Sequence, residues 1–369
     1  MNPRFAPQKI LMTADAVGGV WTYALELARA LEDHGVQIAL AVMGPPPSDD
    51  QRAAATRQPN VVLHHADFVL EWMDDPWREV DQAGDWLLQI AADFEPDLIH
   101  LNGYVHAPLP WPAPVMVVAH SCVRSWWTAV RREPVPARYE EYHHRVRWGL
   151  ANADLLVAPT AAMLRALGTH YGEYASGEVI SNACAPEEFP PADKAPKIFA
   201  AGRAWDDAKN LCLLDTAAPE VRWPIYLAGD RHHPGGRDAV FPHLNCLGKL
   251  DAAAMRTQLA HSAIYALPAR YEPFGLSALE AALSGCALVL GDIPSLREVW
   301  EDAALFVNPD NRTELVHVLN TLIDRPALRE DMARRARARG LCYTPERMAQ
   351  GYLAAYRRCL EPQTERVAA

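Results

Sequence analysis

The residues best placed for chemistry lie between Tyr265 and Ser284. The apolar run Ala263–Leu267 predicts a buried strand, and a loop follows it as far as Gly275. Good helix formers begin at Leu276 and predict a helix there. Glu272 stands just before this helix and Glu280 stands one turn inside it, so both carboxylates can face one cleft.

This strand-to-helix turn suits a phosphate group with hydroxyls on either side. Gly275 allows close approach to the backbone, and the N–H groups of a first helical turn attract anions. Glu280 can accept hydrogen bonds from two vicinal hydroxyls of a ribose, and Glu272 can accept from a sugar. Because the chain has 46 acidic residues, a solvated loop glutamate and a surface helix glutamate remain the alternative on spacing alone.

A basic element follows the first strand of the second half of the chain, Lys197–Ala201. Gly202 opens it, Arg203 offers a planar fork for phosphate oxygens, and Lys209 supplies a point charge. These two cations suit a diphosphate. The alternative is a surface arginine and lysine at the start of a helix.

In the first half of the chain, two expected strands are followed by residues that could contact a ligand. Gly18 and Gly19 follow the strand Lys9–Thr13, but they form neither G-x-G-x-x-G nor a Walker A loop, so the sequence does not support a dinucleotide enzyme or a P-loop NTPase. His120 closes the strand Val115–Ala119. A histidine at a strand end can contact a ligand or can be structural.

Strands alternate with helices along both halves, which predicts parallel βαβ units and doubly wound α/β sheets. A proline-rich stretch, Ala185–Pro196, predicts a linker between them. Further strands are expected at Val36–Val42, Asp97–Leu101, Asp154–Ala158, Ile225–Ala228, Leu244–Leu247, Ala287–Leu290 and Leu305–Val307. Helices are expected from Val20 to Leu31 and at Asp85–Phe94, Pro136–Ala151, Ala161–Tyr171, Arg312–Asp324, Pro326–Gly340 and Pro345–Leu360.

Composition narrows the class of protein. The chain has 369 residues, of which 50% are hydrophobic and 22% charged, which is typical of a globular protein of two domains. A net charge of −11 disfavours non-specific binding of nucleic acid. The start of the chain lacks an apolar signal region and the seven cysteines form no C-x-x-C pair, so we expect a cytoplasmic protein with reduced thiols. Peripheral contact with the inner face of a membrane stays open.

The string E-P-F-G-L-S-A-L-E, from Glu272 to Glu280, resembles the E-x7-E signature of retaining glycosyltransferases of family 4, also called "group 1". The G-R…K-N element at 202–210 resembles the same family. This resemblance implies the GT-B fold, in which two Rossmann-like domains face a central cleft. It implies an acceptor-side domain over residues 1–187, a donor-binding domain over 188–349, and a last helix, 350–369, that crosses back to the first.

The resemblance also implies roles for single residues. Glu272, His120, Arg203 and Lys209 would form the reaction centre, with Glu272 and His120 positioning the donor. The residues that would bind the donor are Gly18, Gly19, Arg203, Lys209, Leu250, Glu272, Phe274, Gly275, Leu276, Ser277 and Glu280. The chain departs from the family at Ser181–Ala185, where a P-N-G-V-D turn is usual, so Asn182 receives no role.

The implied reaction transfers a hexose from a UDP- or GDP-sugar to an unidentified acceptor, with retention and with no bound metal or other cofactor. No D-x-D motif occurs. The alternatives are a GT-B sugar-phosphate synthase, a phosphorylase-like enzyme, or a non-catalytic protein that binds nucleotide sugars.

The stretch from Ser125 to Trp148 is rich in arginine, histidine and tryptophan. It can be an acceptor site or a surface for anionic lipid. We favour a solvated helix with Trp148 in the core, because Glu133, Glu140 and Glu141 dilute the charge. The paired histidines along the chain are adjacent and do not match a metal-binding spacing.

Overall fold

The computed structural model describes residues 7–174, 176–232, 236 and 238–361. The chain divides into two compact units. The first unit comprises the described residues of Met1–Ser125, Pro134–Asn182 and Pro345–Ala369. The second unit comprises those of Trp126–Glu133 and Ala183–Thr344. The described residues from Pro345 onward therefore belong to the first unit, and the segment Trp126–Glu133 belongs to the second.

The first unit is built on a parallel sheet of seven strands in the order β3-β2-β1-β4-β5-β6-β7. The strands are β1 (Lys9–Asp15), β2 (Gln37–Met43), β3 (Val61–Ala66), β4 (Leu98–Leu101), β5 (Val115–Val118), β6 (Leu155–Ala158) and β7 (Gly177–Val179). In β1, Ile10 pairs with Ile38 on one side and with Leu98 on the other. Both faces of these central strands are buried, which explains their continuous apolar runs.

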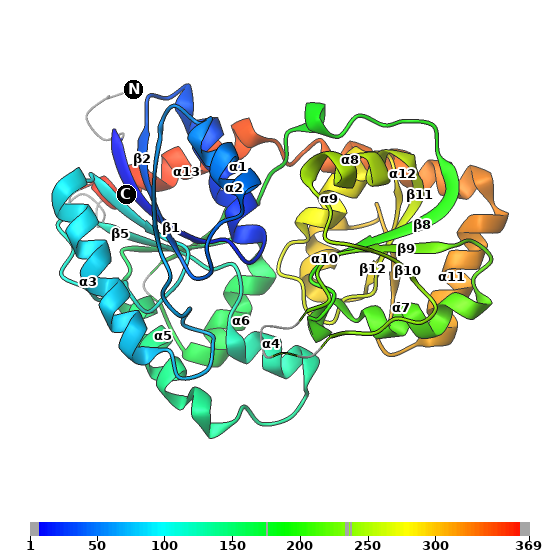
Figure 1. Cartoon of the computed structure of the whole chain (residues 1–369), viewed down its shortest axis with the longest axis horizontal. Coiled ribbons are helices and arrows are strands. Elements are labelled where there is room, and N and C mark those ends of the chain that lie inside the picture. Colours follow the sequence, from blue (N-terminus) through cyan, green and yellow to red (C-terminus); the bar gives the residue numbers. More distant parts are fainter. Residues whose placement is uncertain (1–6, 175, 233–235, 237, 362–369) are drawn as a thin grey trace. The chain divides into compact units, whose positions relative to one another are not determined.

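Helices cover both faces of this sheet, as Figure 1 shows. They are α1 (Gly19–Glu32), α2 (Asp49–Thr56), α3 (Trp77–Phe94), α4 (Val123–Val130), which runs across the boundary with the second unit, α5 (Glu140–Asn152), α6 (Ala161–Tyr171) and α13 (Pro345–Leu360). The helix α13 packs against α1, and its Tyr352 and Tyr356 are fully buried. The Tyr356 hydroxyl lies 2.8 Å from Nδ1 of His100, a buried residue of β4. The C-terminal helix is thus part of the core of the first unit.

The second unit holds a parallel sheet of six strands in the order β10-β9-β8-β11-β12-β13. The strands are β8 (Ala195–Ala201), β9 (Ile225–Ala228), β10 (Asn245–Gly248), β11 (Ser262–Leu267), β12 (Ala287–Gly291) and β13 (Leu305–Val307). Its helices are α7 (Leu211–Ala217), α8 (Ala252–His261), α9 (Leu276–Leu283), α10 (Pro294–Trp300), α11 (Arg312–Asp324) and α12 (Pro326–Gly340). The order places β8 and β11 at the centre, where the chain reverses direction across the sheet. Ligands of open α/β sheets bind at such a point.

The expected fold class is confirmed: each unit is a Rossmann-like parallel sheet with helices. Most expected strands and helices begin and end within two residues of those observed. No range was predicted from the sequence for β3, β7, α2, α4, α7, α8 or α10. Both missed strands are edge strands of the first sheet, so they lack the long apolar runs of strands that are buried on two faces. Helix α3 is longer than expected and begins at Trp77.

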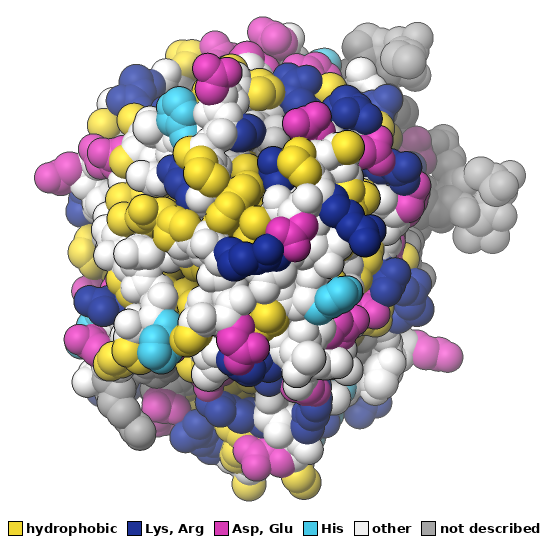
Figure 2. All heavy atoms as spheres, turned by 90° about the vertical axis from the view of Figure 1, so that its right-hand side faces the viewer, with side chains coloured by type: hydrophobic (Ala, Val, Ile, Leu, Met, Phe, Trp, Pro, Cys, Tyr) yellow, Lys and Arg dark blue, Asp and Glu magenta, His cyan; other side chains and the backbone are white. Residues whose placement is uncertain are grey.

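The surface carries mixed charges. Figure 2 shows basic and acidic side chains interspersed among apolar ones on the face where α11 lies in Figure 1. Within the described residues, no helix is both long and apolar enough to cross a membrane. The expectation that Trp148 lies in the core was wrong: its side chain on α5 is 64% exposed. Tyr142 and Val146 are among the residues of α5 that are buried instead.

One backbone contact fixes the loops after β8 and β9. Gly229 follows β9 with φ +147°, and a Cβ on it would lie 1.7 Å from the carbonyl oxygen of Gly202, which follows β8. No side chain fits at this distance. The two loops can therefore pack only because residue 229 is a glycine.

Replacing Gly229 with alanine should push these loops apart and lower the free energy of unfolding by about 3 kcal/mol or more. Gly168→Ala is a matched control, because the nearest atom to its Cβ is a side-chain carbon of Tyr174 at 3.9 Å and the residue lies in α6. That variant should be neutral or up to roughly 1 kcal/mol more stable. Urea titration of both variants measures the difference, and equal midpoints would contradict the packing argument.

Candidate functional site

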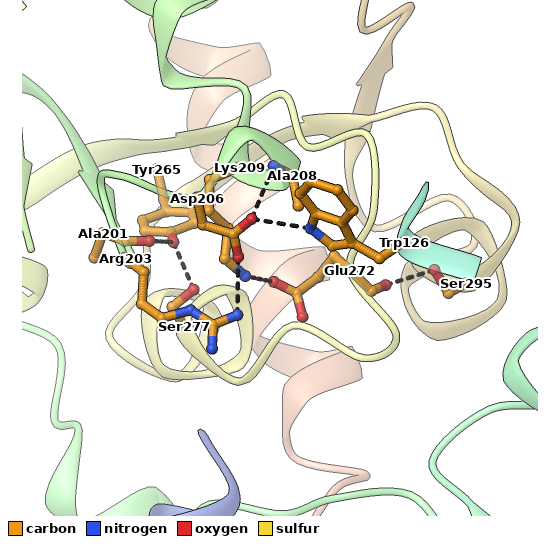
Figure 3. Close-up of polar contacts among 10 residues, drawn as sticks. All are labelled: Trp126, Ala201, Arg203, Asp206, Ala208, Lys209, Tyr265, Glu272, Ser277 and Ser295. Atoms are coloured by element: carbon orange, nitrogen blue, oxygen red, sulfur yellow. Dashed lines mark hydrogen bonds and ion pairs between the residues drawn. The ribbon is translucent and has the colours of Figure 1, made fainter. Parts of the chain in front are cut away.

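An ion pair lies at the centre of the candidate site. Nζ of Lys209 is 2.5 Å from Oε2 of Glu272, and the two side chains are only 15% and 12% exposed. Lys209 ends the short 3-10 helix η4 (Asp207–Lys209), which follows β8, and Glu272 lies in the loop between β11 and α9. Figure 3 shows the second carboxylate oxygen of Glu272 directed away from the lysine. The carboxyl ends of the two central strands thus bring these residues together.

The neighbouring Arg203 is held by Asp206. One guanidinium nitrogen of Arg203 donates to Oδ2 of Asp206 at 2.8 Å. Oδ1 of Asp206 accepts from the indole N–H of Trp126 at 3.1 Å and from the backbone N–H of Ala208 at 3.0 Å. Burial alone would raise the pKa of Asp206, but the charges of Arg203 and Lys209 and these hydrogen bonds hold it below its usual range. Asp206 therefore stays ionised and fixes both the arginine and the start of η4 (Figure 3).

Asn210 connects three loops at this edge of the sheet. Its backbone is left-handed, with φ 55°. Its side-chain nitrogen donates to the carbonyl oxygens of Pro268 at 2.8 Å and Pro309 at 2.7 Å, and its side-chain oxygen accepts from Arg270. Asn210 is buried, so these bonds also satisfy its polar atoms. Asn210 thereby connects the loops that follow β8, β11 and β13.

Helix α9 begins beside the ion pair. Gly275 precedes it with φ 94°, and a Cβ there would lie 3.2 Å from Leu296. The Tyr265 hydroxyl is 2.7 Å from the Ser277 hydroxyl, and Ser295 donates to the backbone carbonyl of Glu272 at 2.6 Å. The first N–H groups of a helix have no partner within the helix. This end of α9 can therefore hold an anion in a position that its neighbours fix (Figure 3).

The other expected residues of the second unit differ in what they can offer a ligand. The Phe274 side chain is 2% exposed and packs edge-on against Tyr343, so only its backbone can reach a ligand. Leu250 and Leu276 are partly buried and pack on the hydrophobic core. Glu280 is partly buried on α9, and burial raises its pKa to about 7 despite the opposing charge of Arg256.

His120 lies at the end of β5 in the first unit. Its Nε2 is 2.8 Å from Oδ1 of Asn102, whose side-chain nitrogen donates to the carbonyl oxygen of Thr13 at 2.6 Å. That second bond fixes the amide orientation, so Nε2 carries the hydrogen and Nδ1 is the acceptor. Burial lowers the pKa of His120 to about 3. The ring is neutral at physiological pH and can accept a hydrogen bond but cannot act as a cationic acid.

The glycine loop follows β1 in the same unit. Gly18 is the extended N-cap residue of α1, and Gly19 is the first residue of that helix. Oδ1 of Asp15 accepts from the backbone N–H of Val17 at 2.9 Å, which orders the loop. The start of α1 thus follows the carboxyl end of a central strand.

The structure brings Arg203, Lys209, Glu272, Gly275 and Ser277 together in the second unit. His120, Gly18 and Gly19 lie at strand ends of the first. The roles of Trp126, Asp206 and Asn210 were not predicted from the sequence. Only Asn210 carried a signal, because it belongs to the K-N pair. Among the residues that the structure describes, no group of three or more histidine, cysteine or acidic side chains is arranged to hold a metal ion.

Comparison with known proteins identifies the family. A family model described as "Glycosyltransferase Family 4" matches residues 17–188, and one described as "Glycosyl transferases group 1" matches residues 241–339. The chain belongs to glycosyltransferase family 4. It is 24% identical to a glycogen synthase of Mycobacterium tuberculosis over 94% of each chain. Members of this family are transferases, as the sequence motifs implied.

Solved structures place the family 4 chain in the GT-B fold. A sucrose-phosphate synthase from Thermosynechococcus elongatus has a TM-score of 0.79 and 17% identity, covering 98% of this chain and 100% of that one. Anabaena HepE in complex with UDP-glucose has a TM-score of 0.73 and 16% identity, covering 94% of this chain and 98% of the other. The expected GT-B architecture of two Rossmann-like domains is therefore confirmed.

The ion pair allows a test of the site's energetics. Lys209→Met leaves the Glu272 carboxylate partly buried without its cation, which should cost about 3 kcal/mol and lower the melting temperature by roughly 6 to 12 °C. The double variant Lys209→Met/Glu272→Gln should recover most of that loss. Arg334→Met is the control, because its pair with Asp331 leaves the arginine 70% exposed; it should shift stability by less than about 1 kcal/mol. Similar calorimetric melting temperatures for both single variants would argue against a stabilising pair.

Proposed function

We propose that this protein transfers a hexose from a nucleotide diphosphate sugar to a hydroxyl group of an acceptor, with retention at the anomeric carbon. The observation that carries this proposal is the Lys209–Glu272 pair beside the start of α9, with Arg203 close to it. Such a set offers positive charge and a backbone anion site for a diphosphate, and a carboxylate for a sugar.

The diphosphate would take the place beside Lys209, Arg203 and the first turn of α9. Arg203 can hold two phosphate oxygens at once, whereas Lys209 can reach the leaving oxygen as a point charge. Charge builds on the leaving nucleotide as the bond to the sugar breaks, so fixed positive groups lower the barrier. Arg203, Lys209 and the N–H groups of α9 supply this charge without a metal ion.

Two glutamates would hold the sugars of the donor. Because Lys209 fixes one oxygen of Glu272, the other can accept from a hydroxyl of the hexose. Glu280 lies one turn further along α9, where its carboxylate can accept from both ribose hydroxyls. Because His120 is neutral, its Nδ1 would accept a hydrogen bond from a hydroxyl of the transferred sugar. It would not donate a proton as an imidazolium.

In the reaction, the bond between the anomeric carbon and the diphosphate oxygen breaks, and a bond from that carbon to the acceptor oxygen forms on the same face. The proton of the acceptor hydroxyl passes to the leaving phosphate oxygen, so no enzyme nucleophile is required. Glu272 acts in this scheme as a positioning group for the donor. Gly18 and Gly19 would let the backbone approach the donor phosphate.

UDP-glucose is the donor that we favour. Anabaena HepE has been solved with UDP-glucose, and its fold is shared by this chain. A GDP-sugar is the alternative donor. The likeness to a sucrose-phosphate synthase favours, as a second candidate function, transfer to a phosphorylated sugar.

We place the enzyme in the cytoplasm as part of this proposal. Trp148 is exposed on α5, and Arg147 beside it is exposed as well. An exposed tryptophan next to a basic residue suits the surface of an anionic membrane. This feature supports peripheral contact by the first unit.

Removing either donor contact should abolish turnover. Glu280→Ala and Lys209→Ala should each lower the release of UDP from UDP-glucose by at least about 100-fold, because each removes a group that binds or stabilises the nucleotide. Glu330→Ala, at an exposed carboxylate of α12, is the control and should leave the rate unchanged. Assays with and without EDTA, below the melting temperature of each variant, should agree. Rates close to wild type in both site variants would refute the site assignment.

The raised pKa of Glu280 predicts a pH-dependent affinity for the donor. Ribose hydroxyls bind the ionised carboxylate better than the acid, so the dissociation constant for UDP-glucose should rise up to tenfold per pH unit below about 7 and level off above it. The charged groups that act on Glu280 are Arg256 and Glu188. UDP-glucose is the suitable probe because the terminal phosphate of free UDP titrates near pH 6.

Calorimetric titration between pH 5.5 and 8.5 measures this dependence. Glu280→Gln should bind more weakly at pH 8 and lose the dependence. A wild-type slope that persists in that variant would assign the titration to another group.

A further inference from the structure

A small pocket in the first unit has no role in the donor chemistry. It has a volume of about 140 Å³ and lies between the segment after β3, the start of α3 and the start of α5. Its lining consists of acidic and aromatic side chains with one arginine: Glu71, Met73, Asp74, Asp75, Pro76, Trp77, Arg138, Tyr139 and Tyr142. Pockets for drug-sized ligands measure about 300–1,000 Å³, so this one has room for a single ring.

Glu71 connects the pocket to the strand ends of the first unit. Its Oε2 accepts from the backbone N–H of Tyr104 at 3.3 Å and of Val105 at 3.4 Å, in the segment that follows β4. Asn102, which opens that segment, is the partner of His120. Burial raises the pKa of Glu71 to about 7, and Asp15 at the end of β1 contributes. The carboxylate therefore lies at the edge that also carries His120 and the glycine loop.

Arginine side chains pack against two aromatic rings that line the pocket. The guanidinium of Arg145 lies 4.6 Å from the centre of the Trp77 ring, and that of Arg138 lies 5.0 Å from the centre of the Tyr139 ring. Arg138 also pairs with Asp74 at 3.7 Å. Tyr142 is only 2% exposed and is the most buried aromatic residue of the lining. Rings held in this way present fixed apolar faces next to hydrogen-bonding groups.

We propose that this pocket binds the acceptor, and that the acceptor presents an uncharged hydroxylated ring to it, such as a terminal sugar residue or a cyclic polyol. This inference rests on the proposed transferase function. Aromatic faces pack on the C–H face of such a ring, while Glu71 accepts a hydrogen bond from a ring hydroxyl and Arg138 donates one. Three carboxylates against one guanidinium repel a phosphorylated ring.

Saturation-transfer NMR on the full chain tests the pocket directly. The probes are methyl α-glucoside and myo-inositol, compared with glucose 6-phosphate. Glu71→Gln keeps an acceptor for the two backbone N–H groups but loses the charge, and Tyr139→Leu removes an aromatic wall. Glu79→Gln is the matched control, since Glu79 also accepts from a backbone N–H, that of Val69 at 2.9 Å, but does not line the pocket.

We expect at least one neutral probe to bind, with an affinity reduced tenfold or more in Glu71→Gln and Tyr139→Leu and unchanged in Glu79→Gln. Glucose 6-phosphate should bind more weakly than the neutral probes, because the pocket carries more carboxylates than guanidinium groups. The pocket assignment is overturned if no neutral probe binds, if glucose 6-phosphate binds best, or if the pocket variants bind like wild type.

A separate thermal-shift measurement with UDP-glucose reports on the donor site. A stabilising shift that persists in Glu71→Gln and Tyr139→Leu keeps the proposed function even if the pocket assignment fails. No shift in the wild-type protein would count against the donor proposal, whatever the result with the sugar probes.

Discussion

The candidate site depends most on the hydrogen bonds made by the side chain of Asn210. This side chain donates to two carbonyl groups from different loops in buried hydrogen bonds and accepts from the partly buried Arg270. A buried amide that lost these partners would carry the cost of unsatisfied polar atoms. Lys209 directly precedes Asn210 in the chain. The hydrogen bonds that satisfy the Asn210 amide therefore also fix the position of the lysine. The charge that we propose to act on the donor is therefore positioned by a residue that need not touch it.

Each cation near the start of α9 has its own carboxylate in the second unit. Arg203 is held by Asp206, and Lys209 by Glu272. These pairs limit the cost of keeping positive charge in a partly buried place before a ligand arrives. The two carboxylates differ in their contacts. Asp206 is buried, and both of its oxygens accept hydrogen bonds. Glu272 has one oxygen that is directed away from the lysine. In the proposed function, a diphosphate would share Lys209 with Glu272 without breaking the ion pair.

The sequence allowed the central strands, the late helices and the Glu272–Glu280 turn to be predicted, because buried runs and helix formers are local signals. It did not allow the partners of Asp206 to be predicted, since Trp126 reaches it from 80 residues away. The type of a single side chain does not say whether its position faces the core or the solvent. For that reason the exposure of Trp148 and the burial of Phe274 became clear only in three dimensions. The edge strands β3 and β7 were missed because a strand with one neighbour needs less apolar sequence.

The placement of α13 in the first unit has a consequence for synthesis on the ribosome. His100 is made long before its partner Tyr356, which lies in α13, 256 residues further along the chain. Domains usually fold from the N-terminus as they emerge. Here the second unit, which ends at Thr344, is complete in sequence before the first one is. The earlier part of the first unit must therefore wait, with α1 uncovered on one side, until α13 has been made.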